Sequence, residues 1–379
     1  MIKTPKSSFM TTPSRRQLLK AGGAAVLTTP FVSRAWAATT QINMLAWYGH
    51  GEPDMVAEYE AANNVKFVPK YYAGGDNMLA LIAQSPPGTY DLILSDAEFV
   101  QQLNLAGYID EMDPADYPMD DMLHEDFQQF PGHWVDGKMY SMILRGGHLG
   151  VSYNKNSVTA EEAASYECFW KPELEGKVGH FDWHLPSLGM MSLYKGNGAG
   201  LWDLDDAKWE AVQDTTMSLR KQVGGFFDYG GTFNSLKNGE MQAMVGIGDW
   251  ITGVLEKDGA PVASVIPKEG GIQFTESYSI GKGSEKATEV KKFIQYMMSP
   301  TGQVKSAQMA AYPGFCVTKA GRAALIDADL TEATRSHQIE GDPQDPITLI
   351  KEGRIHYRDL PQQQGLEDWN DFWSEYKNA

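Results

Sequence analysis

The sequence lacks the long basic runs typical of nucleic-acid-binding proteins and, beyond residue 40, the long apolar stretches typical of membrane-spanning proteins. Its 379 residues carry 32 Lys and Arg against 49 Asp and Glu, a formal charge of −17, and beyond residue 40 no basic run is longer than a pair. This balance argues against binding to a phosphate backbone or an anionic lipid surface. No apolar stretch beyond residue 40 approaches the roughly 18 residues that a membrane-spanning helix needs.

Cysteine is also scarce, with only Cys168 and Cys316 present. A disulfide between them would close a long loop and stabilise the fold, but their spacing does not show whether the two Cα atoms come within bonding reach. Two buried free thiols is an equally weighted alternative. Neither cysteine lies in a pattern typical of a catalytic thiol or a metal clamp, so we expect no metal and no cofactor.

Hydrophobic and aromatic residues, in contrast, are plentiful. Hydrophobic residues make up 42% of the chain, and there are 10 Trp, 17 Tyr and 15 Phe. Such a chain can bury one or two full cores, which excludes disorder, and its length suggests two domains. The aromatic side chains can serve those cores or the walls of a ligand pocket.

The first residues have the features of an export signal. The twin arginines Arg15 and Arg16 precede a moderately apolar run from Ala21 to Val32 and the small residues Ala35 and Ala37. This order resembles a twin-arginine signal peptide with its cleavage site. It predicts export to the bacterial periplasm by the twin-arginine route, with residues 1–37 outside the fold; a disordered basic tail is the alternative.

Strand and helix patterns alternate after this segment. We expect a strand from Ile42 to Ala46, a helix from Pro53 to Asn63, a strand from Val65 to Tyr71, a helix near Asn77–Ser85 and a strand at Asp91–Leu94. This alternation predicts a parallel sheet covered by helices, which binds ligands at the carboxyl ends of its strands. The loops Trp47–His50 and Ser95–Glu98 follow two such ends.

A second α/β unit begins near Gly147. Its expected strands are Leu149–Tyr153, Lys177–Phe181 and Met241–Ile247, and its expected helices are Leu204–Val223 and Trp250–Asp258. An amphipathic helix follows at 287–297 and stops before Pro300. Two α/β units joined more than once predict two lobes around a cleft.

Several segments, in order along nearly the whole chain, resemble the spermidine/putrescine-binding proteins of bacterial ABC importers. The matching residues are Trp47, Tyr90-Asp91-Leu92, Tyr140-Ser141, Trp170-Lys171-Pro172-Glu173 with Gly176, Asn238-Gly239-Glu240, Pro267-Lys268-Glu269-Gly270-Gly271 and Tyr312-Pro313. The resemblance implies an α/β, two-lobed periplasmic binding protein fold, each lobe a sheet flanked by helices, with the ligand in the interlobe cleft. It also implies a monomer without membrane insertion that works with an ABC permease and its ATPase.

The lobes expected from this resemblance are residues 41–146 plus 274–300 and residues 147–273 plus 301–379. The family holds the ammonium groups of polyamines with carboxylates and packs the methylene chain between aromatic rings. Trp47, Phe274 and Tyr312 match its aromatic positions, and Glu276 stands where the family has an aspartate.

The departures from the family pattern change the expected ligand. Trp183 and Pro186 replace an acidic pair, His50 replaces a tyrosine, Asp96 and Glu98 replace a serine and a tyrosine, and a tryptophan is displaced to Trp250. Because an unpaired buried ammonium costs several kcal/mol, a long polyamine should bind poorly. Ring faces favour a cation without N–H donors, such as a quaternary ammonium or a sulfonium.

We therefore expect a small cationic or zwitterionic solute, of the dimethylsulfoniopropionate or glycine betaine type, in an aromatic cage with Glu276 as counter-charge. Arg145 is the expected partner of the solute carboxylate, with an interlobe salt bridge as the alternative; His50 or His184 is a further candidate donor. Polyamine binding remains the alternative function, and a periplasmic hydrolase a distant one that lacks a Gly-x-Ser-x-Gly elbow. The expected binding residues are Trp47, Tyr48, His50, Asp96, Arg145, Trp183, Trp250, Phe274, Glu276, Tyr278 and Tyr312.

A pair of histidines and a pair of tyrosines resemble binding motifs, but we interpret both pairs as structural residues. His180 and His184 are four residues apart, a metal-ligand spacing on a helix, but their segment is expected to be strand and loop. Tyr71 and Tyr72 are assigned to the second strand.

Overall fold

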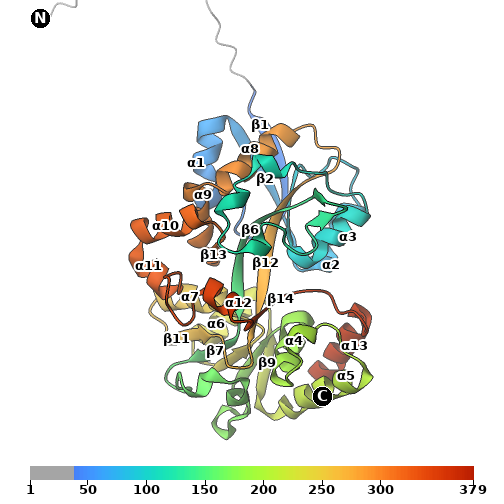
Figure 1. The fold of residues 1–379 in the computed structure, drawn as a ribbon. Helices are drawn as coiled ribbons and strands as arrows, with labels where there is room; N and C mark the ends of the chain where they lie inside the picture. The colour runs from blue at the N-terminus through green and yellow to red at the C-terminus, as the bar shows by residue number, and fades with distance from the viewer. Residues whose placement is uncertain (1–37) are drawn as a thin grey trace, which may run out of the picture. The chain divides into compact units, whose positions relative to one another are not determined.

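The computed structural model describes residues 38–379, of which Thr39–Ala379 form one compact unit. The predicted signal peptide, residues 1–37, lies outside the described residues. The unit contains two main sheets, each flanked by helices (Figure 1). The expected two-lobed α/β fold is confirmed.

The sheet of the first lobe has the strand order β13-β6-β12-β3-β1-β2, with β14 also paired to β12. Strands β1, β2 and β3 run parallel, as the alternation of strands and helices predicts. Buried Ile42 and Met44 anchor β1 in the core. The strands are β1 (Thr40–Ala46), β2 (Val65–Tyr71), β3 (Leu92–Asp96), β6 (Met142–Leu149), β12 (Gly271–Ile280), β13 (Phe315–Cys316) and β14 (Ile355–Tyr357); a separate hairpin pairs β4 (Trp134–Val135) with β5 (Lys138–Met139).

The sheet of the second lobe has the order β11-β7-β10-β8-β9, in which β10, β8 and β9 run parallel. Its core is rich in aromatic residues, among them Tyr166, Phe169 and Trp369. The strands are β7 (Val151–Asn154), β8 (Val178–Phe181), β9 (Val223–Phe227), β10 (Ala243–Val245) and β11 (Val262–Val265).

The helices begin and end close to the expected residues. Pro53 opens α1 at a position where its missing N–H is harmless, and Asn64 ends it in the left-handed region at φ 52°. The helices of the first lobe are α1 (Pro53–Asn63), α2 (Gly75–Ala83), α3 (Val100–Leu105), α8 (Ala287–Met297), α9 (Pro300–Ala307), α10 (Lys319–Ala328) and α11 (Leu330–Arg335), and α12 (Pro346–Lys351) lies beside β14. Those of the second lobe are α4 (His184–Tyr194), α5 (Asp206–Ser218), α6 (Tyr229–Lys237), α7 (Asp249–Lys257) and α13 (Leu366–Asn378).

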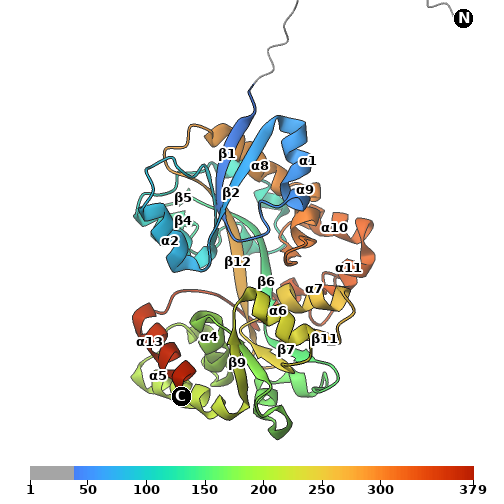
Figure 2. The ribbon, with the colours of Figure 1, turned by 180° about the vertical axis from the view of Figure 1, so that it is seen from behind.

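The chain passes between the two sheets three times (Figures 1 and 2). Strand β6 leads through Gly150 into β7, and β11 is followed by β12, so these two crossings are made by neighbouring strands. The third crossing is the segment 358–365, which joins β14 to α13. These three crossing segments join the two lobes.

The segment 301–379 is divided differently from the expectation, which placed all of it in the second lobe. Strand β13 pairs with β6 of the first sheet, α9 packs against α1, and α10 packs on α9. Phe315 and Val317 are buried in the core of the first lobe, which explains this placement. Helix α13 does pack on α4 and α5 of the second lobe, where it buries Trp369 and Phe372.

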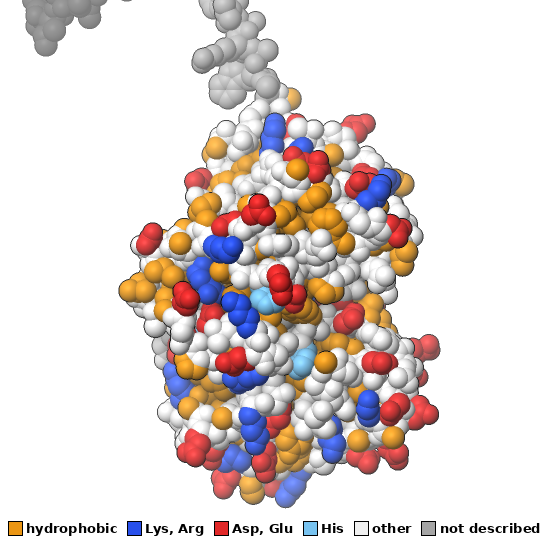
Figure 3. Space-filling model, viewed as in Figure 1, with side chains coloured by type: hydrophobic (Ala, Val, Ile, Leu, Met, Phe, Trp, Pro, Cys, Tyr) orange, Lys and Arg blue, Asp and Glu red, His pale blue; other side chains and the backbone are white. Residues whose placement is uncertain are grey.

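Cys168 and Cys316 are free and buried, and they belong to the hydrophobic clusters of different lobes. The structure therefore agrees with the alternative of two buried free thiols, not with a disulfide. On the face drawn in Figure 3, acidic and basic side chains are interspersed over both lobes. None of the helices among residues 38–379 combines the length and apolarity needed to cross a membrane.

Candidate functional site

A cavity of about 320 Å³ lies between the two lobes, at the lower end of the volumes typical of ligand pockets. Its walls come largely from loops at the carboxyl ends of parallel strands in both sheets, the edge at which such sheets bind ligands. We call it the interlobe cavity. It is lined by Trp47, Tyr48, Tyr72, Ala73, Asp96, Leu149, Phe181, Trp183, Pro186, Tyr229, Gly246, Trp250, Phe274, Glu276, Tyr312 and Arg358.

Aromatic rings from the two lobes face one another across this cavity. Each of three ring pairs takes one member from the first lobe and one from the second. Such pairs form only while the lobes are close together, so the structure has the lobes in contact. The pairs are Trp47 with Trp183 (centroids 6.2 Å apart), Tyr48 with Tyr229 (6.5 Å) and Tyr312 with Trp250 (6.0 Å).

Short local features position these rings. Trp47 directly follows β1, where its indole Nε1 donates to Asp96 Oδ2 at 3.1 Å. Trp183 is the residue before α4 and has an extended backbone conformation. The hydroxyl of Tyr229, the first residue of α6, donates to the Ala311 carbonyl of the other lobe at 2.6 Å. Tyr48 is 51% exposed and therefore forms the rim of the cavity.

Glu276 is held by a buried network behind the cavity wall. Its Oε2 accepts from Arg145 Nε at 2.6 Å and lies 3.1 Å from His50 Nε2, and its Oε1 accepts from the Tyr312 hydroxyl at 2.6 Å. Burial by itself would raise the pKa of Glu276, but Arg145 and His50 lower it well below its usual value. Burial also lowers the pKa of His50, although Glu276 opposes this shift. The carboxylate is ionised and already paired.

The structure gives Arg145 a different place from the one expected. Its side chain is fully buried, and Nη1 donates to the Ser306 carbonyl at 2.7 Å and to the Tyr312 carbonyl at 3.1 Å. It pairs with Glu276 because the two residues face each other in the β6–β12 register, within one lobe. Arg145 is thus not among the residues that line the cavity, and its salt bridge lies within the first lobe instead of between the lobes.

A second charged cluster does lie at the cavity wall. Arg358 Nη2 is 2.7 Å from Asp96 Oδ1, and Arg358 Nε donates to Glu98 Oε1 at 2.5 Å. The Arg358 guanidinium also lies 4.5 Å from the centroid of the Trp183 ring. Burial raises the pKa of Asp96 to about 6 and that of Glu98 to about 8, although Arg358 opposes both shifts.

Eight of the eleven expected residues line the interlobe cavity. The other three, His50, Arg145 and Tyr278, are fully buried behind it, and Tyr278 packs against Phe293 in the core. The eight lining residues are Trp47, Tyr48, Asp96, Trp183, Trp250, Phe274, Glu276 and Tyr312.

Sequence reasoning missed Tyr72, Phe181, Tyr229 and Arg358 as lining residues. The sequence predicts Tyr72 in the second strand, whereas in the structure it directly follows the end of β2. The rule that ligands bind beyond the carboxyl ends of parallel strands, which identifies Trp47, also applies to Tyr72. Arg358 follows the short strand β14 and carries no periodic signal. His180 and His184 do not share a site, because His180 bonds the Tyr376 hydroxyl in the core of the second lobe.

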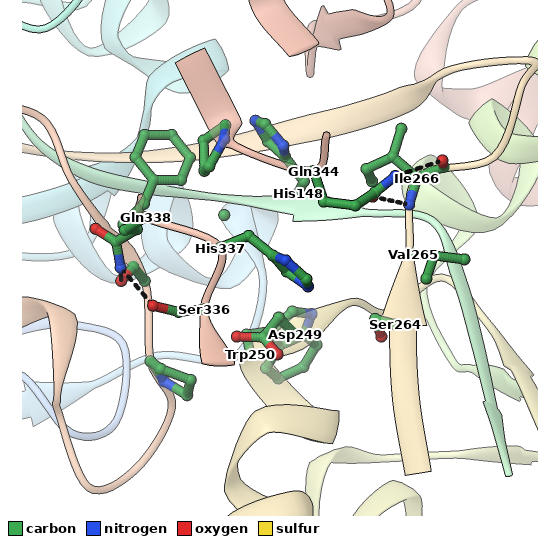
Figure 4. Close-up of a pocket in the computed structure, with 15 residues that line it drawn as sticks. His148, Asp249, Trp250, Ser264, Val265, Ile266, Ser336, His337, Gln338 and Gln344 are labelled. Carbon is green, nitrogen blue, oxygen red and sulfur yellow. Dashed lines mark hydrogen bonds between the residues drawn. The ribbon is translucent and has the colours of Figure 1, made fainter. Parts of the chain in front are cut away.

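Trp250 also lines a second, smaller cavity of about 60 Å³ (Figure 4). His337 and Asp249 lie beside it, and Gln344 donates to the Ile266 carbonyl at its edge. This volume holds water molecules but not an organic solute of several heavy atoms. We take the interlobe cavity as the candidate ligand site because aromatic rings of both lobes line it.

Comparison with known proteins supports the same conclusion. Residues 54–331 match the bacterial extracellular solute-binding proteins. The spermidine/putrescine-binding periplasmic protein 1 of Haemophilus influenzae is 24% identical over 73% of this chain and 76% of its own length, and the corresponding Escherichia coli protein is 24% identical over 79% and 83%.

Among solved structures, the spermidine/putrescine transporter substrate-binding protein PotD of Streptococcus pneumoniae superposes with a TM-score of 0.72. It is 15% identical, and the superposition covers 89% of this chain and 99% of that one. This likeness concerns the fold. The family match shows that this chain belongs to the bacterial extracellular solute-binding proteins.

Proposed function

We propose that this chain is the periplasmic receptor of an ABC importer, exported through its twin-arginine segment, and that it delivers a small organic cation to a permease driven by an ATPase. Membership of the solute-binding family supports the receptor role. The periplasmic relatives support the compartment. Binding and lobe closure suffice for this function, so no covalent chemistry is assigned.

The interlobe cavity favours a compact onium zwitterion of the dimethylsulfoniopropionate or glycine betaine type. The observation that carries this proposal is that the two carboxylates of the wall already have cationic partners: Glu276 pairs with Arg145, and Asp96 with Arg358. What remains for a cation is a set of ring faces, each worth about 0.5–2 kcal/mol. A methylated cation loses no N–H hydrogen bonds when it enters such an enclosure.

The second candidate is a polyamine. The named relatives are spermidine/putrescine-binding proteins, so the comparisons support a polyamine better than an onium ligand. Asp96 and Glu276 at the wall are the groups that could receive an ammonium. A diamine would, however, have to compete with Arg358 and Arg145 for these carboxylates. The two candidates therefore differ in which wall groups carry the affinity.

The mechanism in either case is closure on the solute. Because the three ring pairs span the two lobes, a solute among them contacts both lobes only when they are together. The solute shifts the open–closed equilibrium by the difference between its affinities for the two forms, and by no more.

Calorimetric titration of the purified protein with dimethylsulfoniopropionate, glycine betaine, putrescine and spermidine tests the proposal. We expect saturable binding of an onium compound and weak or no binding of the polyamines. Tight binding of putrescine with no response to either onium compound would assign the polyamine function instead.

Trp183→Ala should weaken onium binding about twofold to thirtyfold, the equivalent of 0.5–2 kcal/mol for one ring face. Trp170→Ala is the matched control, because Trp170 stacks on Tyr194 and is not part of the cavity wall. Equal effects of the two substitutions would contradict the cage.

A further inference from the structure

Arg358 occupies a distinctive position in the interlobe cavity. Among the described residues 38–379, it is the one basic side chain in the cavity wall. It lies on the third crossing segment, after β14 of the first sheet and before α13 of the second lobe. Its guanidinium contacts Asp96 and Glu98 of the first lobe and the ring of Trp183 of the second.

The hydrogen-bonding capacity of Arg358 is mostly unused. A guanidinium has five N–H donors. Only Nε makes a hydrogen bond in the structure, to Glu98, and Nη2 approaches Asp96 at 2.7 Å in a geometry that leaves Nη2 without a hydrogen bond. The side chain is only 4% exposed. Buried donors without partners are costly, so a group that accepts hydrogen bonds here would be stabilised.

We infer that Arg358 is the anchor for the anionic end of a zwitterionic solute, binding its carboxylate through the free guanidinium N–H groups while the aromatic rings hold the cationic end. This inference rests on the proposed receptor function and narrows its ligand class to zwitterions. A planar guanidinium is suited to the task because its fork matches the two oxygens of a carboxylate. Stacking on Trp183 leaves the edge of the guanidinium, which carries the N–H groups, available.

The charges around the cavity agree with a net-neutral solute. Arg145 compensates Glu276, and Arg358 compensates Asp96. Burial raises the pKa of Glu98 to about 8, which weakens the repulsion between this carboxyl and an incoming carboxylate. A solute with two positive charges would add charge that these paired carboxylates do not compensate, whereas a zwitterion adds no net charge.

The test uses glycine betaine and choline, which share a trimethylammonium group and differ in that choline carries an uncharged hydroxymethyl group in place of the carboxylate. Calorimetry should show that the unaltered protein binds glycine betaine more tightly than choline. Arg358→Gln should weaken glycine betaine binding at least tenfold and change choline binding less than about threefold, and Arg358→Lys should fall between. Arg220→Gln is the control, since Arg220 lies over the Phe226 ring away from the cavity.

Two outcomes would overturn the inference. If Arg358→Gln weakens both compounds equally, or neither, the guanidinium is a structural wall and not a carboxylate anchor; melting temperatures of the ligand-free variants show whether the fold is intact. If the unaltered protein binds neither compound but binds putrescine, the onium proposal itself fails, and this result appears before any variant is made. The two failures are therefore distinguishable.

Discussion

Arg145 provides the sharpest quantitative prediction, because the structure gives it a supporting role where the sequence favoured a ligand contact. Its guanidinium is fully buried against Glu276, with two further hydrogen bonds to carbonyls. Arg145→Met would leave the Glu276 carboxylate buried without its cation. Breaking a buried ion pair in this way costs about 3–5 kcal/mol of unfolding free energy.

Urea unfolding of the ligand-free protein measures this loss, and the absence of ligand avoids stabilisation by binding. The Lys138–Glu111 pair has the same 2.6 Å N–O distance but is more than half exposed, so Lys138→Met should leave the urea midpoint almost unchanged. Arg145→Met combined with Glu276→Gln should be less unstable than the two single losses added together, because no lone charge remains.

The reasoning would be refuted if Arg145→Met unfolded at the same urea concentration as the unaltered protein but no longer bound its solute. That result would return Arg145 to the ligand-binding role expected from the sequence. A loss of stability with retained binding in the surviving folded fraction is the outcome that the buried network predicts.

Three further predictions follow from other groups. Burial raises the folded-state pKa of Glu98 to about 8, so the unaltered protein should lose stability as pH rises from about 4.5 to 8. Glu98→Gln should remove part of this loss, which melting temperatures at pH 5 and pH 8 would show. If the substitution shifts the melting temperature equally at both pH values, the prediction is wrong. Arg335 joins the lobes by donating to both carboxylate oxygens of Asp249, at 2.7 and 3.1 Å. Arg335→Ala should therefore speed solute release severalfold in stopped-flow measurements. An unchanged release rate would show that this ion pair does not hold the lobes together. Cys168 and Cys316, whose thiol pKa values burial raises to about 12, should react with a thiol reagent only after denaturation.

Much of the fold could be predicted because its signals are local. Pro53 at the start of α1 and the alternating apolar residues of β1 determine those elements through neighbours a few residues away, and both occur where expected. Trp47 and Asp96 were found as lining residues by one rule, that ligands bind beyond the carboxyl ends of parallel strands.

The rest depends on contacts between residues far apart in the chain. Glu276 lies opposite Arg145 only because β12 pairs with β6 in one particular register, 131 residues apart in sequence. Arg358 reaches Glu98 across 260 residues, and it follows a strand of only three residues that has no periodicity to detect. The placement of α9 and β13 in the first lobe likewise follows from tertiary packing.

The concentration of indole rings in the interlobe cavity has a practical consequence. Trp47, Trp183 and Trp250, three of the chain's 10 tryptophans, line the interlobe cavity, in which we propose that the solute binds. Their intrinsic fluorescence depends on the polarity around each ring, so the emission spectrum should change as water there is replaced by solute. The receptor thereby contains its own optical reporter of occupancy, and candidate solutes can be ranked without a label.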